Sequence, residues 1–241
     1  MPNGKLFIGC SGYQYGHWKG CFYPDDLPKG KWLDYYQDHF DTVEINNSFY
    51  QLPDKKTFDS WREQAAEKFT FTLKFSRYGT HMKKLKDPEE PIEKFLDHAT
   101  HLGSHIGAIL VQLPPNWNSN PERLDGFLSA APDRHRWAVE FRDESWLNEE
   151  NFEILERYNA ALCIHDIIPD HPRRQTADWS YWRFHGDPPG ESYSHQHLSA
   201  RADEIAAEMQ DGRDVYAYFN NDKKGYALQN ASQLRRYLKN R

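Results

Sequence analysis

The sequence predicts a (β/α)₈ barrel, built by residues 1–241 as a single domain. Eight short apolar runs recur along the chain, and most are followed by a loop and a segment with helical spacing. Strands that alternate with helices form parallel sheets with right-handed crossovers, and eight such units are typical of this barrel. An open, doubly wound sheet is the alternative that the same alternation allows.

The eight predicted strands are short and rich in β-branched and aromatic residues. They are expected at 5–10 (KLFIGC), 42–46 (TVEIN), 69–75 (FTFTLKF), 107–113 (GAILVQL), 136–141 (RWAVEF), 161–165 (ALCIH), 180–185 (SYWRFH) and 215–220 (VYAYFN).

The segments between most of these strands have helical spacing. One begins after Pro53 and Asp54, a helix start signal, and another ends at Gly103. The predicted helices lie at 31–40, 56–69, 91–103, 121–131, 149–159, 200–210 and 232–240. Between Asp166 and Asp178 the chain is too short and too rich in proline for a full helix, so the unit between strands six and seven is expected to be irregular.

Composition restricts the partners and the compartment. The net charge is −6 and the mean hydropathy is −0.92, so neither a uniformly basic surface nor a membrane partner is expected. The three cysteines show no metal-binding spacing, and the first ten residues lack the pattern of a signal peptide. These features predict a cytoplasmic protein with reduced thiols. The oligomeric state is not readable from the sequence.

Polar and apolar residues alternate within the predicted strands, although strands of a buried parallel sheet are usually continuously apolar. Thr42 and Glu44 alternate with Val43 and Ile45. In the last strand, Tyr216 and Tyr218 alternate in the same way with apolar residues. In a barrel, the apolar set must pack under the helices, so the polar set points inward and its later members lie near the C-terminal mouth.

Charged residues therefore gather at one end of the predicted barrel. They come from four strands, and Asp166 would add a fifth. The set is Glu44, Lys74, Glu140, Arg142, Arg183 and His185. A packed network of ion pairs is the structural alternative, but each desolvated charge costs several kcal/mol unless it is compensated. So many charges at the end where barrel enzymes place their sites favour a ligand or catalytic site.

Long motifs in the chain resemble the YecE-like family, which is catalogued as domain of unknown function seventy-two. The matching segments are GCSGYQYGHWKGCFYP (9–24), FDTVEINNSFYQLP (40–53), KFSRYGTHMKKL (74–85), VQLPP (111–115), EFRDESW (140–146), RFHG (183–186) and YFNND (218–222). The resemblance covers nearly the whole chain and implies a TIM-barrel fold. It implies no settled activity, substrate or cofactor.

The favoured interpretation is an enzyme that acts on a phosphate-bearing sugar or nucleotide-like ligand, a small anionic molecule. Glu140 is the expected base, His185 the proton shuttle, and Glu44 a further catalytic carboxylate. Arginine suits phosphate and carboxylate groups, so an anion clamp is expected. The residues expected to bind the ligand are Lys74, Arg142, Arg183, Asn46, Gln112, Asp166, Tyr218, Asn220, Tyr13, Trp18 and Trp146. Aromatic residues on strand-following loops could also stack the bases of a single-stranded nucleic acid.

Three other interpretations stay open. Glu140, Asp166, His185 and Asn220 or Asp222 come in the order of the metal ligands in xylose-isomerase-like and endonuclease-IV-like barrels, so a metal-dependent isomerase or phosphodiesterase is one alternative. Neighbouring arginines would repel a cation, so no metal or other cofactor is assigned. Two glutamates could hydrolyse a glycosidic bond without metal, although their strands lie nearly opposite each other. A non-catalytic protein that binds a ligand or nucleic acid is the third.

Overall fold

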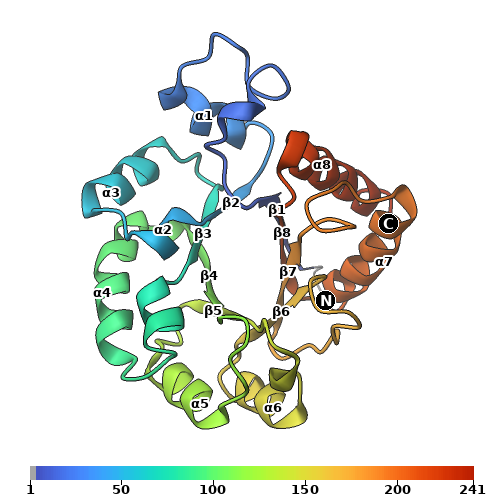
Figure 1. Ribbon diagram of the computed structural model, residues 1–241. Helices are drawn as coiled ribbons and strands as arrows, with labels where there is room; N and C mark the ends of the chain where they lie inside the picture. The colour runs from blue at the N-terminus through green and yellow to red at the C-terminus, as the bar shows by residue number, and fades with distance from the viewer. Residues whose placement is uncertain (1–3) are drawn as a thin grey trace.

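A ring of eight parallel strands surrounded by helices forms the core of the molecule in the computed structural model, which describes residues 4–241 (Figure 1). The strands are β1 (Leu6–Cys10), β2 (Thr42–Ile45), β3 (Thr70–Lys74), β4 (Ile106–Gln112), β5 (Arg136–Glu140), β6 (Ala161–His165), β7 (Trp179–Phe184) and β8 (Asp214–Phe219). Their order β1-β8-β7-β6-β5-β4-β3-β2 follows the chain around the ring, and this confirms the predicted (β/α)₈ barrel.

Eight α-helices accompany the strands in the described part of the chain. They are α1 (Trp32–Gln37), α2 (Asn47–Tyr50), α3 (Lys55–Gln64), α4 (Glu89–Ala99), α5 (Pro121–Ala130), α6 (Glu149–Arg157), α7 (His195–Gln210) and α8 (Tyr226–Leu238). The Asp54 side chain caps the start of α3 by accepting a hydrogen bond from the Thr57 amide (2.8 Å). The Asn120 side chain caps α5 by accepting from the Arg123 amide. No helix within residues 4–241 is long and apolar enough to cross a membrane.

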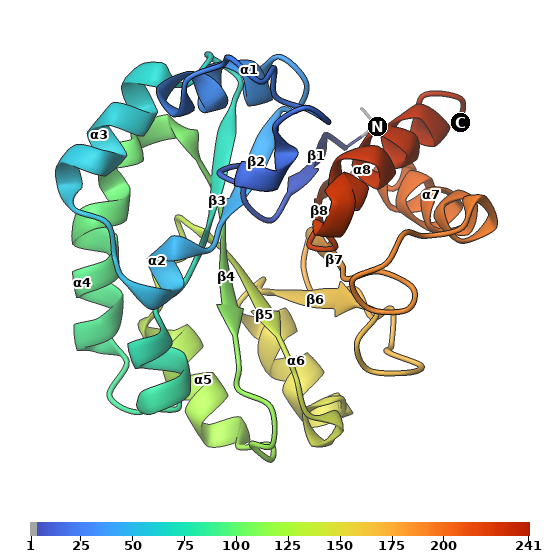
Figure 2. The same cartoon turned by 45° about the horizontal axis from the view of Figure 1, so that its top comes forward.

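The unit between β6 and β7 is irregular, as predicted. A loop without a helix joins these strands on the outside of the ring, in the yellow-orange part of the chain (Figure 2). A short π-helical turn, η3 (Tyr78–Met82), and a 3₁₀ turn, η5 (Glu144–Trp146), follow β3 and β5. Loops and turns of this kind at the C-terminal ends of the strands build the mouth of the barrel.

The barrel closes between β1 and β2 without a regular ladder. The Cys10 amide donates to the Tyr36 hydroxyl (2.8 Å), and this hydroxyl donates to the Thr42 carbonyl (3.1 Å). Gly9 permits this seam, because a Cβ atom at Gly9 would lie 2.0 Å from the Thr42 carbonyl oxygen. One isolated bridge, Ser11 to Glu44, continues the pairing toward the mouth.

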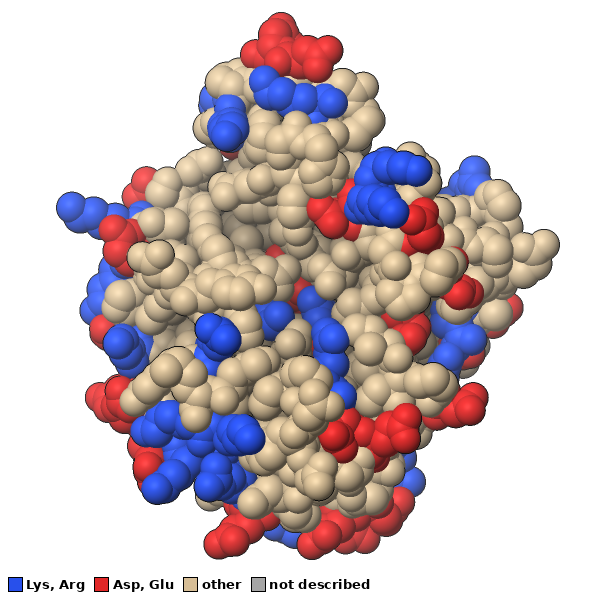
Figure 3. All heavy atoms as spheres, in the orientation of Figure 1, with Lys and Arg blue, Asp and Glu red and all other residues tan. Residues whose placement is uncertain are grey.

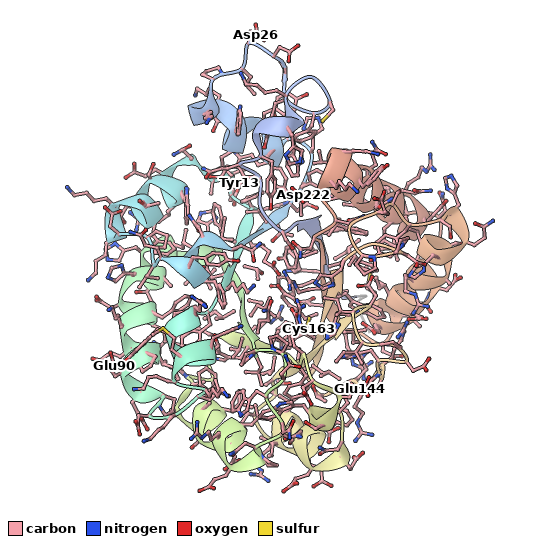
Figure 4. The ribbon with its side chains drawn as sticks, in the orientation of Figure 1. Tyr13, Asp26, Glu90, Glu144, Cys163 and Asp222 are labelled. Atoms are coloured by element: carbon pink, nitrogen blue, oxygen red, sulfur yellow. The ribbon has the colours of Figure 1, made fainter. Side chains whose placement is uncertain are left out.

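The interior of the ring is filled by side chains of alternating size. Large aromatic residues come from β7 and β8, and small residues face them from β5 and β6. The buried set comprises Ala108, Leu110, Ala138, Ala161, Cys163, Trp179, Tyr181, Tyr216 and Tyr218. Figure 4 labels Cys163 on the β6 side of the ring. This filling leaves open space only at the ends of the barrel, so the polar residues that follow on the same strand faces form the floor of the mouth.

Candidate functional site

One buried arginine connects opposite sides of the mouth. Arg183, at the end of β7, donates from Nη2 to Glu44 on β2 (2.8 Å) and from Nη1 to Glu140 on β5 (2.6 Å). The arginine is 2% exposed and both glutamates are fully buried. The two carboxylates that the sequence places on opposite strands therefore meet at a single guanidinium group.

Both carboxylates are charged and hold further hydrogen bonds. Burial alone would raise the pKa of Glu44, but Arg183 and the Tyr181 hydroxyl, which donates to it at 2.6 Å, hold the pKa below its usual range. Burial would raise the pKa of Glu140 as well, but Arg183 and Arg142 hold this pKa well below its usual range. Both groups therefore stay ionised at neutral pH and serve as hydrogen-bond acceptors.

Arg142 is the arginine that reaches the open side of this network. Its Nε group donates to Glu140, and its Nη2 group donates to Gln112 at 3.2 Å. Its side chain is 18% exposed, against 2% for Arg183. Part of one guanidinium group is therefore free to contact a molecule in the mouth.

His185 is oriented by Asp166 and points its other nitrogen at the arginines. Its Nδ1 atom lies 3.1 Å from the Asp166 carboxylate, which also accepts from the Tyr193 hydroxyl. With Nδ1–H donated to Asp166, the lone pair of Nε2 faces Arg142 Nη2 at 3.4 Å. Burial lowers the pKa of His185, the hydrogen bond to Asp166 opposes this, and Arg183 lowers it further. The imidazole is therefore neutral near pH 7 and has the form of a base.

Lys74 completes the group of cations at the mouth. It ends β3, is 7% exposed, and places Nζ 4.3 Å from the centre of the Phe49 ring. Burial is the main reason that the pKa of Lys74 falls to about 8, and the neighbouring Arg183 contributes. Figure 3 shows basic side chains reaching the surface in the middle of this face, beside a hollow.

Other predicted residues lie at different depths. Asn46 and Tyr13 line a cavity of about 160 Å³ together with Gln14 and Trp61, next to the charge network. Asn220 follows β8 at the rim and is partly exposed. Tyr218 lies deeper, fully buried, where its hydroxyl bonds to threonines on β2 and β3. It supports the floor of the mouth and does not line the open space.

Two predicted stacking residues are packed inside the loops. Trp18 is fully buried and contacts Tyr15 and Tyr23. Trp146 is fully buried, stacks on Phe141 with ring centres 5.2 Å apart, and donates to a backbone carbonyl. Neither indole has a face open to a ligand, which corrects the expectation that these rings contact one.

Three residues of the network were missed by the sequence interpretation. His165 ends β6, and its Nε2 atom lies 2.7 Å from the Phe141 carbonyl. The period-two pattern of ALCIH already places His165 on the inward face, so the signal was present. Tyr181 has the same signal, since it precedes Arg183 by two residues. Tyr193 lies in a loop and could not be found this way.

The cavities on the surface do not all lie beside the network of charged residues at the mouth. One hollow of about 890 Å³ is an open groove between α4 and α5 that contains none of the network residues. A second, about 390 Å³, lies beside the β6–β7 loop and is lined by His165, Asp166, Arg183 and their neighbours. The chemistry of the lining, not the volume, therefore locates the candidate site at the mouth.

The residues considered as metal ligands do not form a metal site. Within residues 4–241, no three His, Cys, Asp or Glu side chains are arranged to hold a metal ion. Both carboxylate oxygens of Glu140 accept from arginines, and the Nε2 lone pair of His185 faces the guanidinium groups of Arg142 and Arg183, so both groups lie in surroundings that repel a cation.

Comparisons with known proteins agree with the fold. The family model described as "Protein of unknown function DUF72" matches residues 7–241. The chain is 32% identical to YecE of Escherichia coli (strain K12) over 142 residues, which is 57% of this chain and 52% of that protein, so the match spans about half the length of YecE. YunF of Bacillus subtilis (strain 168) is 25% identical, with 95% of this chain and 93% of that protein covered.

Solved structures of DUF72 family proteins are similar to this chain in fold. A DUF72 family protein from Thermotoga maritima has a TM-score of 0.87 and 28% identity, and the comparison covers 98% of this chain and 99% of that chain. A DUF72 protein from Enterococcus faecalis has a TM-score of 0.81 at 20% identity, with 97% and 95% covered. A glycoside hydrolase family 5 enzyme from Prevotella bryantii has a TM-score of 0.52 at 10% identity, with 97% and 95% covered, and shares only the fold.

Proposed function

Because the chain belongs to the DUF72 family, whose function is unknown, we propose its function from the chemistry of the mouth: an enzyme that acts on a phosphate-bearing sugar or nucleotide-like ligand. Arg142 and Lys74 would bind the anionic group, and His185 would move a proton. Arg183, Glu44 and Glu140 would form the rigid frame beneath them.

The observation that carries this proposal is the approach of a neutral histidine to a partly open guanidinium group. His185 Nε2 lies 3.4 Å from Arg142 Nη2. An anion that bonds to Arg142 would place its neighbouring hydroxyl or ring carbon within reach of the Nε2 lone pair. Asp166 fixes the imidazole tautomer and would stabilise the imidazolium ion formed when the proton is taken.

The frame explains why we assign proton transfer to His185 and not to Glu140. Each carboxylate oxygen of Glu140 accepts from an arginine, and its pKa is well below the usual range. Such a group is a weak base and cannot act as an acid at neutral pH. The same holds for Glu44, which contacts Arg183 and Tyr181. Two carboxylates locked to one guanidinium also leave no space for a sugar between them, which disfavours glycoside hydrolysis by this pair.

The test uses thermal shifts with sugar phosphates and nucleotides, and two matched variants. Arg142→Ala removes the open guanidinium group just after β5, whereas Arg134→Ala removes an arginine just before β5, at the opposite end of the barrel. We expect at least one phosphate-bearing compound to raise the Tm of the wild type and of Arg134→Ala, but not of Arg142→Ala. His185→Gln should keep the shift and lose turnover of that compound. If no such compound shifts the wild type, or if Arg142→Ala responds equally, the proposal is wrong.

One observation favours nucleic acid as the source of the phosphate. Tyr50 is 76% exposed and Tyr78 43% exposed, and both lie on segments that follow strands at the mouth. Lys83 Nζ lies 5.5 Å from the Tyr78 ring centre, and basic side chains gather nearby in Figure 3. Short single-stranded oligonucleotides therefore belong in the same panel, and Tyr50→Ala should weaken their binding without affecting sugar phosphates.

A further inference from the structure

The mouth holds one amine without an ionic partner. Within residues 4–241, no carboxylate lies within 4.0 Å of Lys74 Nζ, and its near neighbour is the face of the Phe49 ring at 4.3 Å. Buried lysines are normally paired, because an isolated ammonium group is costly to remove from water. Lys74 therefore calls for a different explanation from the two arginines beside it.

Among the described residues of the mouth, the pairing of charges leaves Lys74 as the cation without a bonded carboxylate. Three cationic side chains share the mouth with three carboxylates, but Asp166 is bonded to His185 and Tyr193. Arg183 is bonded to the other two carboxylates, and Arg142 occupies the remaining oxygen of Glu140. An anion bound in the mouth would supply the partner that Lys74 lacks, and loss of its proton would remove the need for one. Since the pKa of Lys74 falls to about 8, roughly a tenth of the amine is neutral at pH 7.

The amine is also held in place. Lys74 is the last residue of β3, and the Ser48 hydroxyl donates to its carbonyl at 2.8 Å. The aromatic face of Phe49 covers the end of the side chain. A lysine acts as a nucleophile when its backbone attachment is rigid and its amine is partly shielded from water.

We propose that Lys74 captures a carbonyl group of an anionic ligand as a Schiff base, so that the substrate class is an aldehyde or ketone that carries a phosphate or carboxylate. The anionic part of this assignment rests on the proposed function above, with Arg142 alone binding the anionic group and Lys74 facing the carbonyl carbon. In the condensation, the nitrogen of the neutral amine forms a bond to the carbonyl carbon. Both protons of the amine leave with the carbonyl oxygen as one water molecule, and a C=N bond replaces C=O.

Reductive trapping tests the amine with a probe that carries no charge. The protein is treated at pH 7 with glycolaldehyde and cyanoborohydride, whose hydride reduces the imine to a stable secondary amine, and labelled lysines are counted by peptide mass spectrometry. Lys84 is the matched control, because it also lies near an aromatic ring, 5.8 Å from Trp117, but is exposed. We expect Lys74 to react ~10- to 100-fold faster than Lys84, since the amine of Lys74 is held in place against Phe49 and its pKa is lowered.

Lys74→Arg keeps the positive charge and should remove this labelling while the far-UV spectrum of the protein is unchanged. Labelling of Lys74 that is no faster than labelling of Lys84 overturns the inference.

A second probe separates this inference from the proposed function. Glycolaldehyde phosphate differs from the first probe only by the anionic group, and we expect it to label Lys74 more efficiently in the wild type but not in Arg142→Ala. If both aldehydes label Lys74 equally, carbonyl capture stands and anion binding by Arg142 fails. If phosphate compounds shift the Tm through Arg142 while neither aldehyde labels Lys74, the proposed function stands and carbonyl capture fails.

Discussion

Arg183 has an energetic role that its neighbour Arg142 does not share. Its guanidinium group compensates two fully buried carboxylates. Arg183→Met would leave Glu44 without a charged partner, and breaking a buried pair in this way costs ~3–5 kcal/mol. Arg142→Ala leaves Glu140 bonded to Arg183, so a clearly smaller loss is expected. Urea unfolding measures both, and equal losses would show that the two arginines are equivalent.

The histidines of the mouth make stability depend on pH. Burial lowers the pKa of His165 to about 4. Between about pH 6.5 and pH 4 the unfolded chain therefore binds a proton that the folded chain does not, so stability falls as the pH drops through this window. The loss from this group is on the order of 3 kcal/mol and is complete below about pH 4.

His165→Gln should flatten the dependence between pH 6.5 and pH 4, because glutamine cannot be protonated there. The measurement is the free energy of unfolding at a series of pH values. Identical slopes for the variant and the wild type would contradict the assignment to His165.

At the scale of elements, the strands were easier to predict than the helices. All eight strands lie within one residue of their predicted ranges or inside them, because alternation with a period of two is a local property. The helices α7 and α8 begin five or six residues before the predicted starts, at His195 and Tyr226. Ser194 caps α7, and the first turn of α8 is held by packing of Ala227 and Leu228, which spacing alone does not reveal.

In the candidate site, too, the local pattern predicted some features and the packing of distant residues decided others. The alternation predicted which side chains end the strands at the mouth, and the structure brings Glu44, Lys74, Glu140, Arg142 and Arg183 together. It could not predict which cation meets which carboxylate, because that depends on the reach of a side chain across the ring. Nor could it separate Trp18 and Trp146 from residues open to a ligand, since the burial of a loop residue is set by distant contacts.

One phenol group bridges β1 and β2 at the seam that closes the whole molecule. Tyr36→Phe removes the acceptor for the Cys10 amide and the donor for the Thr42 carbonyl, both buried. We expect a loss of about 1–3 kcal/mol and faster hydrogen exchange of the Cys10 amide. Tyr35→Phe is the matched control, because the neighbouring residue is only partly buried. Unchanged exchange at Cys10 in Tyr36→Phe would show that the seam is held by other contacts.

This seam also sets an order of events when the chain is made. The ladder of β1 is formed with β8, and these strands lie at the two ends of the sequence. A ribosome releases β1 well before β8, so the ring cannot close until β8 has emerged. Glu44 likewise emerges well before Arg183, its partner. The charged mouth therefore cannot form before β7 has emerged, and until then Glu44 lacks its ionic partner.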